Sequence, residues 1–259
     1  MKWMRYAHAG TEGFGLLDGD AVQVHDGDMF HQPRPTGARL PLADINWLAP
    51  CRPSKIIGLW NNYRAAAEKN GLTPPAEPLY FLKASSSVTA HQAAIPAPLG
   101  HSGRVVYEGE LAIVIGRRTR AAAPQDAAAS ILGYCCANDV TAVELLRSDP
   151  SFAQWTRAKS FDGFCAFGPV IDTDFNPAST GLRTLVDGRE RQNYLFADMF
   201  FSPAELVSRL SFDMTLEPGD LILCGTSLGA LPMKPGTVVE VVVDGIGTLR
   251  NTYAPPAST

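Results

Sequence analysis

The sequence lacks the features of a membrane, secreted or nucleic-acid-binding protein. Residues 1–8 contain no apolar signal-peptide run, and no stretch approaches the roughly 20 apolar residues of a membrane span. Charged residues make up only 19% of the chain and the net charge is -4, so we expect neither extended disorder nor a general attraction to nucleic acid. We therefore expect a globular cytoplasmic protein without nucleic-acid or membrane partners.

Cysteine and histidine are both scarce. The five cysteines include no C-x-x-C pair, which argues against a disulfide framework and against a zinc cluster. The five histidines all precede the segment Gly225-Thr226-Ser227-Leu228-Gly229, which formally fits the G-x-S-x-G motif of serine hydrolases. That fold needs a histidine after the serine, so we set this class aside.

The sequence divides into a small N-terminal unit and a larger second unit. Residues 1–50 are expected to form the small β-rich unit, and residues 51–259 the larger one. In the first unit, strands are expected at residues 2–8, 13–17 and 21–25. The segment 32–37, which contains two prolines, is expected to end this strand pattern.

The larger unit mixes many strands with a few short helices. Strands are expected at residues 55–59, 79–83, 105–115 and 134–139, and helices at residues 62–70 and 124–132. Ser202-Pro203-Ala204-Glu205 has the capping-box pattern of a helix start. The sum predicts a strand-dominated α+β protein with mixed sheets.

The expected strand at residues 105–115 carries the main chemical signal. Side chains alternate along a strand, so Glu108 and Glu110 point to the same face, between the apolar residues Val106 and Ala112. Burying two like charges so close together is costly unless a positive charge lies between them. The pattern favours a bound divalent cation. The alternative is an edge strand whose two glutamates face water.

A third carboxylate, Asp139, follows another apolar strand in the segment Ala137-Asn138-Asp139-Val140. Three carboxylates form an all-oxygen site, which favours Mg²⁺ or Mn²⁺, with Ca²⁺ as an alternative, over Zn²⁺. By itself, Asp139 could equally well cap a helix or a turn.

Four segments, taken in this order, carry a resemblance to a known family. They are Tyr107-Glu108-Gly109-Glu110-Leu111, Ala137-Asn138-Asp139-Val140, residues 154–162 (QWTRAKSFD) and residues 214–220 (MTLEPGD). Together they resemble the fumarylacetoacetate hydrolase family, from about residue 55 to the end of the chain. The resemblance implies a mixed β-roll of the fumarylacetoacetate hydrolase C-terminal type, assembled as a homodimer. It also implies a small 2-oxo acid or diacid as substrate.

The resemblance also implies roles for individual residues. Mg²⁺ or Mn²⁺ is expected on Glu108, Glu110 and Asp139. Lys159 and Gln154 are expected to take part in catalysis. Substrate binding is expected at Lys83, Thr226, Tyr63 and Arg64.

The chain departs from the family pattern where hydrolytic relatives carry a water-activating His/Glu pair. In the segment that matches N-Y-x-x-H-x-x-E, these positions are Ala66 and Lys69. Because water attack needs such a base, we predict an isomerase, tautomerase or decarboxylase, such as a 2-hydroxyhepta-2,4-diene-1,7-dioate isomerase. His91, His101 or Glu68 could replace the lost base, which keeps C–C bond hydrolysis as an alternative. A non-catalytic protein that binds metal and ligand is a second alternative.

Overall fold

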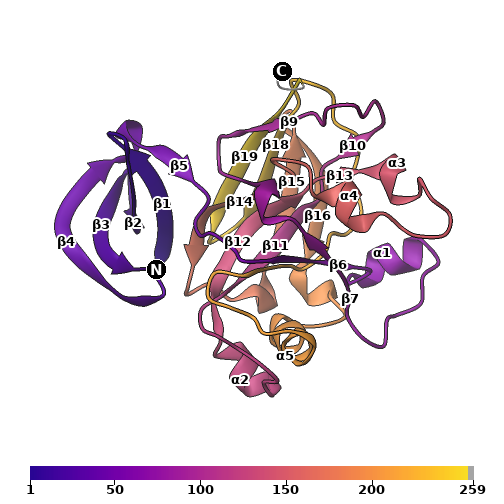
Figure 1. Ribbon diagram of the computed structural model, residues 1–259, viewed down its shortest axis with the longest axis horizontal. Helices are drawn as coiled ribbons and strands as arrows, with labels where there is room; N and C mark the ends of the chain where they lie inside the picture. The colour runs from indigo at the N-terminus through magenta and orange to yellow at the C-terminus, as the bar shows by residue number, and fades with distance from the viewer. Residues whose placement is uncertain (256–259) are drawn as a thin grey trace.

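A computed structural model describes residues 1–255, whose strands form three sheets (Figure 1). The large sheet has twelve strands, and ten of them follow the order β4-β3-β2-β1-β14-β12-β11-β17-β6-β7. A second sheet has the order β16-β15-β18-β19-β9, and β10 pairs with β13 in a third. Antiparallel pairs dominate, but β6 and β17, β8 and β14, and β9 and β19 are parallel. The expected strand-dominated mixed fold is therefore confirmed.

The N-terminal unit is a meander at one end of the large sheet. Its strands are β1 (Lys2–His8), β2 (Thr11–Asp18), β3 (Ala21–Asp28), β4 (His31–Pro41) and β5 (Asn46–Leu48), with a 3₁₀ turn at Leu42–Asp44. The prediction that residues 32–37 end the strand pattern is wrong, because β4 runs through Pro33 and Pro35. Strand β4 lies at the edge of the sheet. Proline has no backbone N–H, and on the outer side of an edge strand no neighbouring strand needs one.

The N-terminal unit is continuous with the rest of the molecule. Strand β1 pairs with β14, with Lys2 opposite Asp172 and Trp3 opposite Ile171. Trp3 and Met29 also pack in one apolar cluster with residues of the central strands. The expected boundary at residue 50 therefore falls within one continuous sheet, and the division into two units stays a prediction.

The central part of the large sheet carries the chemistry. Its strands are β6 (Ile56–Trp60), β7 (Leu79–Lys83), β8 (Val88–Thr89), β11 (Gly109–Ile115), β12 (Ile131–Asp139), β14 (Cys165–Asp172) and β17 (Leu221–Leu223). All seven residues of β11 are buried. Leu111, Ile113 and Ile115 face one apolar cluster, while Ala112 and Val114 face the other. This two-sided burial means that a charge on β11 has little access to water.

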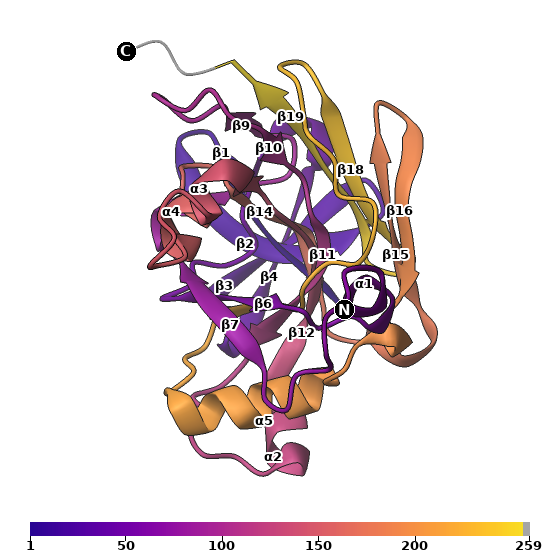
Figure 2. The same ribbon diagram turned by 90° about the vertical axis from the view of Figure 1, so that its right-hand side faces the viewer.

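The two smaller sheets pack beside the central strands. The five-stranded sheet consists of β9 (Ala94–Pro96), β15 (Gly181–Val186), β16 (Arg189–Leu195), β18 (Val238–Val243) and β19 (Gly247–Ala254). The two-stranded sheet consists of β10 (Val105–Val106) and β13 (Thr141–Ala142). Figure 2 shows β15, β16, β18 and β19 as a layer along one side of the molecule.

The helices are short and lie around the edges of the sheets. They are α1 (Arg64–Lys69), α2 (Pro124–Ala128), α3 (Val143–Leu146), α4 (Trp155–Lys159) and α5 (Pro203–Asp213), with 3₁₀ turns at Ser85–Ser87, Pro177–Ser179 and Phe196–Asp198. The capping box of α5 is confirmed, because Ser202 and Glu205 make both reciprocal hydrogen bonds. The helix expected to reach residue 132 ends at Ala128, because Ile131 already pairs with Ile115 in the sheet. In the part of the chain that the structure describes, no helix combines the length and apolarity of a membrane span.

Candidate metal centre

The expected strand at residues 105–115 is interrupted where it meets the site. Strand β10 ends at Val106 and β11 begins at Gly109, because the two parts pair with different sheets. Tyr107 between them is fully buried, and its hydroxyl donates to the carbonyl oxygen of Gly229 at 2.8 Å. The chain thus passes from one sheet to another at Glu108.

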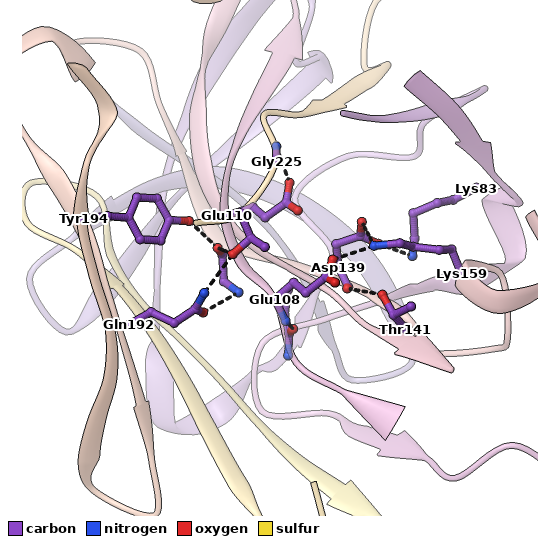
Figure 3. Close-up of polar contacts among 12 residues, drawn as sticks. Lys83, Glu108, Glu110, Asp139, Thr141, Lys159, Gln192, Tyr194 and Gly225 are labelled. Atoms are coloured by element: carbon purple, nitrogen blue, oxygen red, sulfur yellow. Dashed lines mark hydrogen bonds and ion pairs between the residues drawn. The ribbon is translucent and has the colours of Figure 1, made fainter. Parts of the chain in front are cut away.

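Three carboxylates converge at this crossing. One oxygen of each of Glu108, Glu110 and Asp139 lies within 4.8 Å of those of the other two (Figure 3). The pairing of β11 with β12 produces this meeting, since Gly109 lies opposite Asn138 and the Asp139 N–H donates to the Glu108 carbonyl at 2.9 Å. The structure therefore brings together the three residues expected to bind a metal.

Two buried lysines lie on the Asp139 side of the cluster. Lys83 Nζ lies 2.5 Å from one Asp139 oxygen, and Lys159 Nζ lies 2.6 Å from the other. Lys159 also contacts Glu108 at 2.5 Å. Lys83 ends β7 and Lys159 ends α4, and these two elements lie side by side (Figure 2). Both lysines therefore lie against the expected metal ligands, a position that the resemblance implied for Lys159 but not for Lys83, which it placed in the substrate pocket.

The charges are unevenly compensated. Burial would raise the pKa of Asp139, but Lys159 and Lys83 outweigh it and lower that pKa. Burial by itself would lower the pKa of Lys159. The negative charges of Asp139 and Glu108 outweigh this effect, and the pKa of Lys159 is raised. For Glu110, burial raises the pKa well above its usual range, and the Asp139 charge adds to the rise. Glu110 is thus the carboxylate that most needs another positive charge.

These residues fit a divalent cation. Within residues 1–255, the Glu110 carboxylate receives one hydrogen bond, from the Gly225 N–H at 2.7 Å, and no lysine or arginine pairs with it. Buried carboxylates without a partner are costly, and oxygen donors suit Mg²⁺, Mn²⁺ and Ca²⁺. Glu108, Glu110 and Asp139 would hold the ion.

Gly109 stands between the two glutamates, and three side chains hold its backbone in place. We call these three residues, Gln192, Tyr194 and Thr226, the clamp. The Gly109 N–H donates to Gln192 Oε1 at 2.9 Å, and its carbonyl accepts from the hydroxyls of Thr226, at 2.9 Å, and Tyr194 (Figure 3). A Cβ on Gly109 would lie 2.1 Å from Thr184 Oγ1, so this position has no room for a side chain.

The sequence analysis did not identify the roles of Gln192 and Tyr194. Both lie on β16, on the far edge of the five-stranded sheet, and they reach Gly109 only through the folded arrangement of the sheets. The segment 189–195 is polar and mostly exposed, and Gln192 is its one fully buried residue, a difference that the sequence does not show.

Glu108, Glu110, Lys159 and Thr226 line one cavity of about 200 Å³. The expected substrate residue Thr226 therefore lies with the carboxylates. Ala66 lines the same cavity, and its methyl group stands where hydrolytic relatives are expected to carry a histidine. Within residues 1–255, no histidine lines this cavity.

Four other residues expected to bind substrate or take part in catalysis do not line this cavity, and one of them, Lys83, is paired with Asp139. Gln154 precedes α4 and lines a separate depression beside Phe152. Tyr63 is fully buried and packs edge-to-face against Tyr194, with ring centroids 4.9 Å apart. Arg64 donates to the carbonyl oxygens of residues 197 and 199 and lies over the Phe200 ring.

The alternative bases are also outside the cavity. His91 packs against Trp47 and accepts a hydrogen bond from the Arg250 N–H, and burial together with the Arg250 charge lowers its pKa to about 4. His101 lies beside Glu144, with 4.0 Å between the nearest nitrogen and oxygen. Glu68 is exposed on α1.

Comparison with known proteins gives two family matches. Residues 55–254 match the family described as fumarylacetoacetate (FAA) hydrolase C-terminal, and residues 1–50 match the one described as Rv2993c-like, N-terminal. The solved structure of 5-carboxymethyl-2-hydroxymuconate delta-isomerase from Mycobacterium smegmatis is 38% identical, with a TM-score of 0.91 over 98% of this chain and 100% of that one.

Two further relatives have related names. The structure of 2-hydroxyhepta-2,4-diene-1,7-dioate isomerase from Mycobacterium marinum is 37% identical, with a TM-score of 0.90 over 100% of both chains. The oxaloacetate tautomerase YisK of Bacillus subtilis is 35% identical over 224 residues, which cover 81% of this chain and 73% of that protein.

Proposed function

The chain belongs to the fumarylacetoacetate hydrolase family, and from this premise we propose that it is a Mg²⁺- or Mn²⁺-dependent enzyme that converts a small 2-oxo acid through an enolate. The proposed reaction is tautomerisation, isomerisation or decarboxylation. The names of three relatives, two isomerases and one tautomerase, support this class of reaction.

One observation carries the proposal: Glu108 and Glu110 of the carboxylate cluster line the same cavity as Lys159, while Ala66 occupies the position where a histidine is expected in hydrolytic relatives. When bound, a divalent cation supplies positive charge that polarises the 2-oxo group and favours an enolate. A 2-oxo acid has adjacent keto and carboxylate oxygens, which suit a hard-cation site.

Lys159 supplies a second, fixed positive charge. Its ammonium group is buried, and the contacts with Glu108 and Asp139 fix its position at the cavity wall. Because those carboxylates raise the pKa of Lys159, the side chain stays protonated and favours an oxyanion rather than accepting a proton. It therefore stabilises an enolate without acting as a base.

Ala66 argues against efficient hydrolysis. Hydrolysis of a C–C bond requires a base that activates water, a contribution of typically about 10²–10⁴-fold. Among the described residues that line the cavity, the groups that titrate are Glu108, Glu110 and Lys159. Two of these are proposed cation ligands and the third stays protonated, so water has no dedicated base.

The experiment compares two substrates with the same Mg²⁺ supply. We expect kcat/KM for the enol–keto conversion of phenylpyruvate to exceed that for the cleavage of acetylpyruvate, because both are 2-oxo monocarboxylates and the two values then differ mainly in the reaction. Cleavage that is faster by about tenfold or more would show that another base activates water. Loss of all activity with Mg²⁺ and Mn²⁺ would favour the non-catalytic alternative.

A pair of lysine variants isolates the role of Lys159. Lys159→Met should lower kcat by about 10²-fold or more, as expected for the loss of a charge that stabilises an oxyanion. Lys69→Met is the matched control, because Lys69 is exposed on α1 and does not line the cavity. Equal activities of the two variants would remove Lys159 from the proposal.

The homodimer expected from the resemblance stays a prediction. Light scattering at micromolar protein concentration should give twice the mass of the 27.8 kDa chain. A mass of one chain would contradict it.

A further inference from the structure

Aromatic rings form one wall of the cavity that holds the carboxylates. Phe81 of β7 stacks on Trp155 of α4, with ring centroids 5.1 Å apart and planes 12° apart. Trp60, at the end of β6, meets the same Trp155 edge-on at 6.0 Å. All three residues line the cavity. A flat apolar group of a ligand would find stacking partners there.

The remaining walls are apolar or neutral. Leu59, Leu72 and Leu146 contribute aliphatic surface, and Asn61 and Asn70 contribute uncharged amides. Ala66 contributes only a methyl group to this wall. These groups offer packing and hydrogen bonds, but no positive charge, to the part of a ligand that lies beyond the carboxylate cluster.

Lys159 is the sole cation among the described residues that line the cavity, and it is already paired. Its ammonium contacts Glu108 and Asp139. Neither of the two cationic residues expected to bind substrate lines the cavity: Arg64 is turned toward Phe200, and the Lys83 ammonium is paired with Asp139. A second carboxylate on a ligand would therefore lose water without gaining a partner.

The charge of the cluster also matches a single carboxylate. Three carboxylates and two ammonium groups leave one net negative charge, and a divalent cation turns this into one net positive charge. One ligand carboxylate balances that charge. A dianionic ligand leaves a negative charge in a cavity whose one cation, among the described lining residues, is already paired.

We propose that the ligand of this site is a 2-oxo monocarboxylate with an aromatic or extended apolar substituent, and that dicarboxylates are disfavoured. The inference rests on the proposed 2-oxo acid function and specifies its substrate class. It distinguishes this chain from relatives whose names include a dioate.

Two inert ligands with the same metal-binding head test the inference directly. N-phenyloxamate carries a phenyl tail and N-oxalylglycine a carboxylate tail. Titration calorimetry with saturating Mg²⁺ should show that N-phenyloxamate binds about tenfold more tightly, the size expected for one aromatic stacking contact. Equal affinities, or tighter binding of N-oxalylglycine, would overturn the inference.

Substitutions in the aromatic wall should reduce this preference. Trp155→Leu should bring the two affinities within about threefold of each other. Trp60→Leu should have the same effect, and it disturbs the fold less because Trp60 is half-exposed. Trp47→Leu is the control, because Trp47 packs against His91 outside the cavity and should keep the full preference. An unchanged preference in both cavity variants would show that the tail does not lie on this wall.

A charge added to the neutral wall should act in the opposite direction. Asn70→Arg places a cation at the exposed end of α1, beside the cavity. It should shift the affinity ratio toward N-oxalylglycine by about two- to fivefold, as expected for a solvent-exposed ion pair. Asn46→Arg, an exposed position on β5, should leave the ratio unchanged. A ratio that does not move in Asn70→Arg would contradict the proposed place of the tail.

The two proposals fail in different ways. If neither oxamate binds in the presence of Mg²⁺, the 2-oxo acid site itself is refuted, together with the substrate class. If both bind and the dicarboxylate is preferred, the site stands and the substrate class alone is wrong.

Discussion

Asp139 and Glu110 are neighbours in one cluster, yet their surroundings are opposite. The ammonium groups of two lysines lie 2.5 and 2.6 Å from the carboxylate oxygens of Asp139, and their positive charges lower its pKa. The Glu110 carboxylate accepts one hydrogen bond, from a backbone N–H, and burial raises its pKa well above the usual range. Both residues are buried, so the difference comes from the partners and not from exposure.

The contrast indicates two functions within one group of carboxylates. On the Asp139 side, ion pairs link β7, β12 and α4. On the Glu110 side, an uncompensated carboxylate faces the cavity and is ready for an added cation. Each side can be altered separately by a substitution of Asp139 or of Glu110.

The largest expected effect is on the stability of the metal-free protein. Asp139→Asn leaves the buried ammonium of Lys83 without its carboxylate, which should lower the free energy of unfolding by about 3–5 kcal/mol. Glu110→Gln keeps an oxygen acceptor for the Gly225 N–H and removes an unpaired charge, so stability should stay within about 0.5 kcal/mol or rise. Urea denaturation of both variants with EDTA measures the difference. Equal losses would show that the two sides are not distinct.

A second effect comes from the cation itself. Mg²⁺ at one hundred times its Kd should raise the free energy of unfolding of the unmodified protein by about 2.7 kcal/mol. Glu110→Gln should show little of this gain, although its metal-free form is as stable as the parent. Thermal denaturation with and without Mg²⁺ provides the measurement. A full gain in Glu110→Gln would exclude Glu110 as a ligand.

A third prediction concerns the clamp that spaces the two glutamates. Gly109→Ala places a methyl group 2.1 Å from Thr184 Oγ1, so it should cost about 1–3 kcal/mol of stability and weaken Mg²⁺ binding. Adding Thr184→Ala removes the clashing hydroxyl and should restore part of both losses. Calorimetric titration and denaturation of the single and double variants test this. No recovery in the double variant would place the strain elsewhere.

The smallest effect is expected from one hydrogen bond of the clamp. Tyr194→Phe removes the hydroxyl that donates to the Gly109 carbonyl, and should weaken Mg²⁺ binding by about tenfold while the fold is kept. Tyr253→Phe is the control, because Tyr253 lies on β19 and has no contact with Gly109. Calorimetry that finds the same Mg²⁺ affinity in both variants would rule out a positioning role for Tyr194.

The carboxylates could be predicted because their signal is local. The E-x-E spacing predicted that Glu108 and Glu110 point the same way, although the structure breaks the expected strand between them, and Asp139 lies two residues after an apolar segment. The clamp could not be predicted, because Gln192 and Tyr194 reach Gly109 only through the packing of two sheets. No pattern along the chain encodes that contact.

The directions in which some side chains point could not be predicted from the sequence either. Tyr63 and Arg64 are close in sequence to Ala66, which lines the cavity, but Arg64 lies over the Phe200 ring and Tyr63 is buried against Tyr194. Pro33 and Pro35 are compatible with strand β4 because that strand lies at the edge of the sheet. An edge position depends on the order of strands and therefore on the whole fold.

The most direct test of the account is the anomalous diffraction of a crystal grown with Mn²⁺ and oxalate, an inert analogue of the 2-oxo acid head. We predict one strong manganese peak between the carboxylates of Glu108, Glu110 and Asp139, with oxalate in the adjoining cavity. A crystal that contains both compounds but shows no peak at these three residues, or a peak at another site alone, would contradict the account.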